Sequence, residues 1–240
     1  GDSSHVASAL DDVTHIYSTG SAFAALKTDG SVVTWGSPSH GGDSSAVASE
    51  LINVTHIYST GHAFAALKID GSVITWGNPL YGGDNSSVSS ELIDVVQIFS
   101  TIQAFAALKA DGSVVTWGES WAGGDSSHVA SALDDVMHIY STNVAFSALR
   151  SDGSVVTWGS PSDGGDSSAV ASQLSSGVVG LADIYTDDFY TVDTNYSISD
   201  PFSVTEGDGA VSLTITRSNS IGAETVYVST VQTEGFANNG

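Results

Sequence analysis

The stretch Ala22–Gly36 reads AFAALKTDGSVVTWG, and close copies of it begin at Ala63, Ala104 and Ala145, in steps of 41 residues. In each copy an apolar run and a β-branched run flank an Asp-Gly pair. Asp-Gly between two such runs is a strong hairpin signal, because the turn needs positive φ and Gly adopts it at little cost. In the second copy we therefore expect antiparallel strands over 63–68 and 72–76.

The rest of each unit adds a third strand and a connection. We expect the third strand over 54–59, just before the hairpin. The connection begins with Gly-Gly-Asp and continues with small residues up to Leu92, a stretch that predicts two helical turns capped by the Asp. A unit this small cannot bury its own faces, so the units must stack on one another. A period of about 40 residues with several short strands is typical of a β-propeller blade.

The repeats define the predicted domain organisation. Units start near residues 2, 43, 84, 125 and 166, so an array over 1–180 contains four full repeats and a partial fifth. Residues 181–196 are interpreted as a degenerate strand and linker. Four blades are at the low end for closing a ring. We therefore expect further blades before Gly1, or self-association through open blade ends.

The repeated stretch resembles the repeat of the regulator of chromosome condensation (RCC1-like) family, which ends in Trp-Gly and has Gly-Gly a few residues later. The short unit is similar to the three-stranded blades of the bacterial members, which include a β-lactamase inhibitor protein. The resemblance covers residues 1 to about 175 and implies a β-propeller. The chain departs from the family pattern at Ala22 and its equivalents, where the family often has His near the propeller centre.

The C-terminal part resembles a second family. Residues 198–217 read ISDPFSVTEGDGAVSLTITR, which is similar to the opening of a Calx-beta domain. This resemblance implies that residues 197–240 form the N-terminal part of an immunoglobulin-like β-sandwich, truncated at Gly240, so the predicted fold class is all-β throughout. It also implies calcium binding at Glu206 and near Glu234, in a site that is incomplete in this chain.

Composition limits the partners. The chain has 27 acidic and five basic residues, a net charge of −22. Such a charge repels nucleic acids and anionic membranes and attracts cations such as Ca²⁺. The chain has no Cys, which excludes disulfides, Fe–S clusters and thiolate zinc sites. No apolar run is long enough to span a bilayer, so membrane insertion is not expected.

Several columns of the repeat hold residues that could form sites. The tryptophans are interpreted as packing between blades, with an aromatic binding surface as the alternative. The Asp-Gly glycines are interpreted as turn residues. The Gly-Gly-Asp aspartates either cap the helical turns or line a calcium-binding rim. These residues are Trp35, Trp76, Trp117 and Trp158; Gly30, Gly71, Gly112 and Gly153; and Asp43, Asp84, Asp125 and Asp166.

Two further columns carry histidines and cations. The histidines share their column with a Gln, and we expect solvent-facing side chains rather than a metal-binding ring. The cations are interpreted as hairpin-edge residues that pair with nearby Asp and discourage edge-to-edge aggregation. These residues are His15, His56, Gln97 and His138; and Lys27, Lys68, Lys109 and Arg150.

The chain contains no Gly-x-Ser-x-Gly, phosphate-binding Gly-rich loop or His-Glu-x-x-His motif. We therefore expect a non-enzymatic binding or scaffold module of a large bacterial extracellular or cell-surface protein, such as an adhesin, with a protein or glycan partner. The alternative is a secreted inhibitor or regulator of an enzyme. A third interpretation, nucleotide exchange on a small GTPase, follows from the family name alone and conflicts with the acidic charge.

Overall fold

The computed structural model describes residues 3–178, 180, 196–198 and 215–217. The chain divides into two compact units, Gly1–Tyr185 and Thr186–Gly240. In the C-terminal compact unit, β13 (Tyr196–Ile198) and β14 (Ile215–Arg217) pair antiparallel. The expected immunoglobulin-like sandwich and the linker before it otherwise lie outside the described residues.

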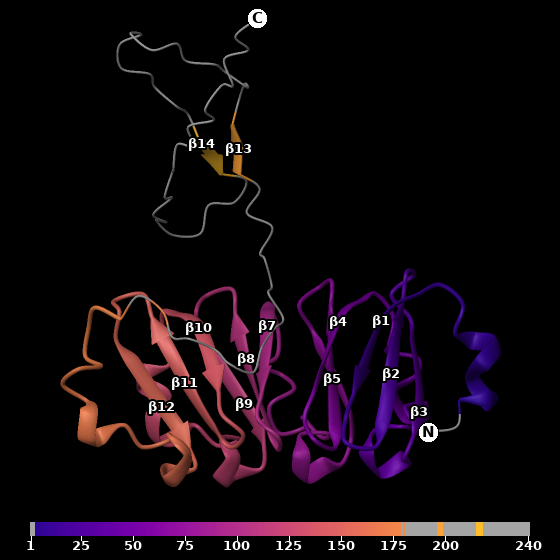
Figure 1. Cartoon of the computed structure of the whole chain (residues 1–240), viewed down its shortest axis with the longest axis horizontal. Helices are drawn as coiled ribbons and strands as arrows, with labels where there is room; N and C mark the ends of the chain where they lie inside the picture. The colour runs from indigo at the N-terminus through magenta and orange to yellow at the C-terminus, as the bar shows by residue number, and fades with distance from the viewer. Residues whose placement is uncertain (1–2, 179, 181–195, 199–214, 218–240) are drawn as a thin grey trace, which may run out of the picture. The chain divides into compact units, whose positions relative to one another are not determined.

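The described residues of the N-terminal compact unit form four three-stranded antiparallel sheets, and within each sheet the strands follow chain order. The prediction of an all-β array with three strands per repeat is confirmed. The sheets stand in a row from the N-terminal to the C-terminal end of the unit (Figure 1). They are β1 (Val13–Ser18), β2 (Ala22–Lys27), β3 (Val32–Gly36); β4 (Val54–Ser59), β5 (Ala63–Lys68), β6 (Val73–Gly77); β7 (Val95–Ser100), β8 (Ala104–Lys109), β9 (Val114–Gly118); and β10 (Val136–Ser141), β11 (Ala145–Arg150), β12 (Val155–Gly159).

The connections contain 3₁₀ turns, which are shorter and tighter than the helical turns expected from the sequence. Ser and Val have modest helix propensity, and a seven-residue stretch is too short to stabilise an α-helix. In the third unit the segment after Asp84 is a series of turns. The 3₁₀ helices are η1 (Ser4–Ala9), η2 (Pro38–His40), η3 (Ser45–Val47), η4 (Pro79–Tyr81), η5 (Ser120–Ala122), η6 (Ser127–Ala132), η7 (Pro161–Asp163) and η8 (Ser168–Val170).

The Asp-Gly pair forms the hairpin turn between the second and third strand of each sheet. Gly30 has a φ of 76°, a backbone conformation that favours glycine. The Asp29 carboxylate accepts hydrogen bonds from the Ser31 backbone N–H at 2.9 Å and the Ser31 hydroxyl at 2.6 Å. These bonds hold the turn and fix the register in which Leu26 pairs with Val32.

Apolar side chains fill the spaces between successive sheets. Ala22, Ala24 and Leu26 of the first sheet form one core with Phe64 and Trp76 of the second, among others. The small alanines allow close approach, and the aromatic side chains of the next sheet fill the space. In the third and fourth sheets Phe105 and Phe146, which are equivalent to Phe64, are likewise 0% and 1% exposed, and full burial of such a side chain contributes about 1.5–3 kcal/mol.

A hydrogen bond from a tryptophan reinforces each of these junctions. The Trp76 indole Nε1–H donates to the Gly41 carbonyl of the preceding unit at 3.0 Å. Trp117 and Trp158 donate to Gly82 and Gly123 at the same distance. The tryptophan column therefore lies in the packing between sheets.

A second set of hydrogen bonds links the loops that precede the second strand of each sheet. The N–H of residue 20 donates to the carbonyl of residue 61, 61 donates to 102, and 102 donates to 143, each at 2.9 Å. This backbone chain runs through all four sheets and does not depend on the side chains at these positions. The sheets therefore keep one spacing even where the residues differ.

The partial fifth unit keeps the backbone pattern of the repeat as far as Val178. Asp12, Asn53, Asp94 and Asp135 all have positive φ before the first strand of a sheet, and Gly177 takes this role with a φ of 78°. The Val178 N–H then donates to the Gly153 carbonyl at 3.0 Å, as Val54 does to Gly30. One inserted residue shifts the repeat register in this partial unit, since Gly177 lies 42 residues after Asp135.

The indole hydrogen bond predicts unequal costs at two tryptophans. Trp117→Phe removes the donor to the Gly82 carbonyl, and an unsatisfied buried acceptor costs about 1–3 kcal/mol. For Trp35 no such bond is present among the described residues, so Trp35→Phe should cost less. Urea unfolding of both variants measures the difference, and equal losses of stability would contradict this role of the indole.

Candidate functional site

When the four repeats are aligned in steps of 41 residues, most aligned positions hold the same residue in every repeat. We call each aligned position a column. The columns that differ most are not spread evenly along the repeat. Three columns carry a different residue in every unit. One lies next to the Asp-Gly turn, and the other two lie together at the opposite end of the sheets. The columns are Thr28, Ile69, Ala110 and Ser151 beside the turn; and Ser21, His62, Gln103 and Val144, together with His40, Tyr81, Ala122 and Asp163, at the other end.

The latter two columns are brought together by hydrogen bonds. In the second unit the Asn78 N–H donates to the His62 carbonyl at 3.0 Å. The Thr60 hydroxyl donates to the Tyr81 carbonyl at 3.0 Å and accepts from the Ala63 N–H at 3.0 Å. Equivalent bonds occur in the other three units. We call residues 20–21, 61–62, 102–103 and 143–144, together with 37–40, 78–81, 119–122 and 160–163, the variable loop edge.

This edge exposes large apolar side chains. Leu80 is 66% exposed, Trp121 52% and Ile102 45%. Leu80 and Trp121 share a column that holds Ser39 and Ser162 in the outer units. The exposed apolar residues therefore gather on the second and third units, and neighbouring apolar side chains on a surface are typical of a binding site.

An aromatic cluster adjoins this patch at the junction of the first two sheets. The His62 ring lies 4.2 Å, between centroids, from both His40 and Tyr81. The His40 Nδ1 is hydrogen-bonded to the hydroxyls of Ser37 and Ser39 at 3.1 and 3.0 Å, whereas the His62 Nδ1 is buried without a partner. Burial lowers the pKa of His62, and the neighbouring His40 lowers it further.

Acidic residues lie on the edge and also line a groove beside it. In the fourth unit the Ser160 and Ser162 hydroxyls donate to Asp163 and lower the pKa of its carboxyl. An open groove of about 590 Å³ lies along β9, between the connecting segments that precede and follow the third sheet. Its lining includes Leu80, Val88, Trp117 and the acidic residues Asp84, Glu91, Glu119 and Asp125. Such a lining favours a cationic group over an anionic one.

The Gly-Gly-Asp aspartates lie at the start of the connecting segments. The Asp43 carboxylate accepts the Ser45 N–H at 2.9 Å, and this bond lowers the pKa of Asp43. The N-cap residue of η3 is Ser44, so Asp43 binds from one position earlier than a helix cap. Asp84, Asp125 and Asp166 make the same bond. Among the described residues no group of three His, Asp or Glu side chains is placed to hold a metal ion.

Glu206 and Glu234, the residues that the Calx-beta resemblance associates with calcium, lie outside the described residues. Calcium binding therefore stays a prediction for both parts of the chain.

The histidine column is less exposed than predicted. His15 faces solvent, but the expectation is wrong for His56 and His138, which are half buried. His56 contacts Tyr17 of the preceding sheet, with the Tyr17 hydroxyl 3.2 Å from the His56 Nδ1. His138 packs edge-on against Phe99. These imidazoles fill space between neighbouring sheets.

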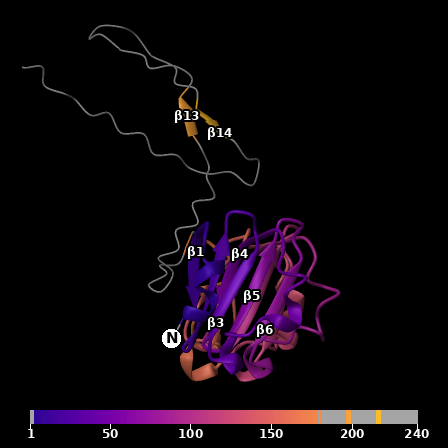
Figure 2. The same ribbon diagram turned by 90° about the vertical axis from the view of Figure 1, so that its right-hand side faces the viewer.

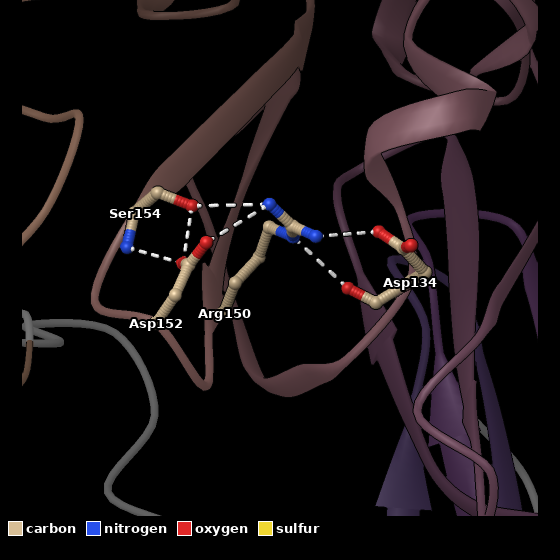
Figure 3. A network of polar contacts seen from close by, with 4 residues as sticks. All are labelled: Asp134, Arg150, Asp152 and Ser154. Atoms are coloured by element: carbon tan, nitrogen blue, oxygen red, sulfur yellow. Dashed lines mark hydrogen bonds and ion pairs between the residues drawn. The ribbon is translucent and has the colours of Figure 1, made fainter.

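Arg150 of the cation column forms the expected ion pairs. Its guanidinium lies 2.7 Å from Asp134 and 3.2 Å from Asp152, and it also donates to the Ser154 hydroxyl (Figure 3). In the second and third units the column of Asp134 holds Ile52 and Ile93, which cannot pair with a cation. Exposed pairs of this kind contribute about 0–1 kcal/mol, so the network is a minor stabilising contact.

Comparisons with known proteins concern the array of sheets. No family model matches the chain, and no curated protein matches it. Yeast RCC1 (Prp20), in a structure with Kap60 bound, is 18% identical over 65% of this chain and 45% of the other, with a TM-score of 0.45. Human WBSCR16 is 18% identical over 61% and 47%, with a TM-score of 0.41. The receptor kinase CR4 ectodomain from Physcomitrella patens is 16% identical over 62% and 39%, with a TM-score of 0.41. The chain spans less than half the length of each of these structures.

Sequence reasoning treated the units as equivalent and so did not find the variable loop edge. The signal was present in the alignment of the units, since the column of His62 and the column of Tyr81 differ in every copy. What the alignment could not supply is that residues about 20 positions apart in each unit come together at one end of the sheets.

The His62 environment predicts a pH-dependent stability. The pKa of His62 is lower in the folded chain than its ordinary value of 6.5, so the unfolded chain binds this proton more readily. The resulting stabilisation is complete above about pH 6.5 and is lost as the pH falls below that value. His62→Gln, which copies Gln103, should reduce the loss of stability on acidification in thermal unfolding between about pH 5 and 8. Parallel profiles for wild type and variant would contradict this assignment.

Proposed function

We propose that the N-terminal compact unit, Gly1–Tyr185, is a binding and scaffold module that contacts a protein partner through the variable loop edge. The observation that carries the proposal is the location of the differences between units. Columns that pack between sheets are almost the same in all four copies, whereas two of the three columns that differ in every copy lie on this edge. The backbone hydrogen bonds of this edge recur in all four units although its side chains differ, so the edge can be adapted to a partner within one fold.

The chemistry of the edge indicates the kind of partner. Leu80, Ile102 and Trp121 offer apolar surface, and burial of such side chains contributes about 1.5–3 kcal/mol each. The adjoining groove is lined by Asp84, Glu91, Glu119 and Asp125. A protein surface with an apolar patch beside a Lys or Arg side chain would complement both features. A glycan, which stacks on exposed aromatic rings such as Trp121, is the alternative ligand.

The setting that we propose is a bacterial extracellular or cell-surface protein, in which the module binds and does not catalyse. The absence of Cys and the net charge of −22 support this setting. Within the described residues, no helix has the length and apolar character needed to cross a membrane. Calcium remains part of the proposal through the Calx-beta resemblance of residues 197–240.

One observation favours the second candidate, an inhibitor or regulator of an enzyme. An interface with a single target needs a few unlike residues at its centre, typically Trp, Tyr or Arg. Nearly identical units argue against this candidate, but Tyr81 and Trp121 each occur in one unit only at their positions on the edge. Measured inhibition of an enzyme retained by the module would favour this candidate over a scaffold.

The experiment compares retained ligands between substitutions that copy residues from other units. Leu80→Ser and Trp121→Ser introduce the side chain of Ser39 and Ser162 on the edge, whereas Ile69→Thr copies Thr28 at the opposite end. Ile69 is 78% exposed and is therefore a matched control. Extracellular protein extracts and a glycan array are probed with the immobilised chain and its variants.

We expect the double edge variant to bind the retained protein at least about 30-fold more weakly, since loss of a central apolar contact costs about 2 kcal/mol. The Ile69→Thr variant should bind as the wild type does. A ligand retained equally by all variants, or lost with Ile69→Thr, would place the binding surface elsewhere. Retention of glycans alone would favour the alternative ligand.

A further inference from the structure

The first sheet of the array carries an apolar face that the other sheets bury. Ile57, Ile98 and Ile139 are 0–2% exposed, because each packs against the preceding sheet. Ile16, at the same position of the first sheet, is 61% exposed. Figure 2 shows the array from this end, with β1 and β3 of the first sheet beside β4, β5 and β6 of the second. Phe23 is half buried, whereas its three equivalents are almost fully buried.

The last sheet carries the complementary socket. A Cβ atom at Gly41, Gly82 or Gly123 would lie 2.5–2.6 Å from the phenyl ring of the next sheet, so in each case that ring occupies the place of a side chain. At Gly164, which has a φ of 102°, a Cβ atom would meet no atom of the described residues within 4 Å. The socket that receives a phenylalanine at the three internal junctions is therefore open at the fourth.

The hydrogen-bonding groups at the two ends match in the same way. At the internal junctions the indole N–H donates to the glycine carbonyl of this socket at 3.0 Å. Trp35 at one end and Gly164 at the other would supply the next donor and acceptor in this series. The backbone chain through residues 20, 61, 102 and 143 likewise ends in the Gly20 carbonyl and the Asn143 N–H.

We propose that these two ends bind each other between two copies of this chain, head to tail. Phe23 and Ile16 of one copy enter the position that Phe146 and Ile139 occupy at the last internal junction. Trp35 donates to the Gly164 carbonyl of the second copy, and the Asn143 N–H of that copy donates to the Gly20 carbonyl. The contact repeats an interface that the chain already forms three times.

The connecting segments set a condition on this contact. At an internal junction one segment bonds to both neighbouring sheets. The segment after Gly42 bonds to the first sheet, through Ser44 and Thr34 at 3.0 Å, and to the second, through the N–H of Ile69 and the carbonyl of Asn53 at 3.0 Å.

At the ends of the array these bonds are divided between two segments. Residues 166–178 bond to the last sheet, for example through Ser167 and Thr157. Residues 3–12 bond to the first sheet, through Asp12 and Thr28. One segment can therefore make both sets of bonds at the joint, and the other is released.

Two copies would contribute eight sheets, which is within the range of about four to eight at which propellers close. A head-to-tail contact forms a ring if its rotation closes and an open chain if it does not. We expect a closed dimer. Because each copy carries a net charge of −22, added salt should strengthen the association by screening the repulsion between copies.

The first experiment measures molecular mass by sedimentation against protein concentration, at low and moderate salt. We expect a doubling of mass with concentration, strengthened by salt. Ile16→Asp should abolish the doubling. Ile52→Asp adds the same charge at a position that is 52% exposed and that holds Asp11 and Asp134 in the outer units, so it should still dimerise. Gly164→Ala places a methyl group in the socket and should also prevent dimerisation, while circular dichroism checks that both monomeric variants remain folded.

A second experiment tests the geometry and uses the absence of Cys from the chain. Gly20→Cys and Asn143→Cys place single thiols at the two ends of the backbone chain. Under oxidation, a mixture of the two variants should form a disulfide-linked pair that neither variant forms alone. A monomer at all concentrations, a dimer that survives Ile16→Asp, or a pair linked through one variant alone would overturn the proposal.

Discussion

The array depends on the contact between an aromatic pair and a glycine in the loop that follows the preceding sheet. Phe64 lies over Gly41, and the Trp76 indole donates to the carbonyl of the same glycine. The contact requires a residue without a side chain and with positive φ, and Gly41 has a φ of 91°. Because one residue provides both the space and the acceptor, the distance and the orientation of successive sheets are set together. This requirement explains why the glycine, the phenylalanine and the tryptophan of this contact are the same in all four units.

The same constraint determines where the units can differ. Alanines such as Ala65 and Ala106 are fully buried between sheets, so a larger side chain there would separate the sheets. At the variable loop edge the anchoring groups are backbone carbonyls and the Thr60 hydroxyl, which hold the loop whatever the neighbouring side chain is. His62 and Tyr81 can therefore be replaced by Gln, Val, Ala or Asp in other units within the same backbone. The columns of the glycine, the alanines and the aromatic pair are therefore nearly invariant, whereas the columns of the edge differ within the same backbone.

Most of the repeat fold could be predicted from the sequence, because its signals are local and recur four times. The Asp-Gly turn and the apolar and β-branched runs on its two sides define the hairpin, and the period of 41 residues defines the stacking. The connecting segments were predicted less well, since weak helix formers such as Ser and Val allow 3₁₀ turns instead of α-helical ones. The half-buried positions of His56 and His138 depend on contacts with the preceding sheet, which a single unit does not contain. The edge was missed for a related reason, since it is formed by residues that are distant within each unit.

A repeat in which every unit supplies half of two interfaces leaves one unmatched half at each end of an open array. In this array, one unmatched surface contains the exposed Ile16 and the Trp35 indole. The other contains the open position beside Gly164. Natural arrays often end in repeats with a polar outer face, which prevents the end repeats from associating with other surfaces. The segments 3–12 and 166–178 lie against the end sheets, yet they leave Ile16 61% exposed, and no atom in the described part of the chain fills the space at Gly164. The ends are therefore only partly capped, and the same contact that orders the interior makes them complementary to each other.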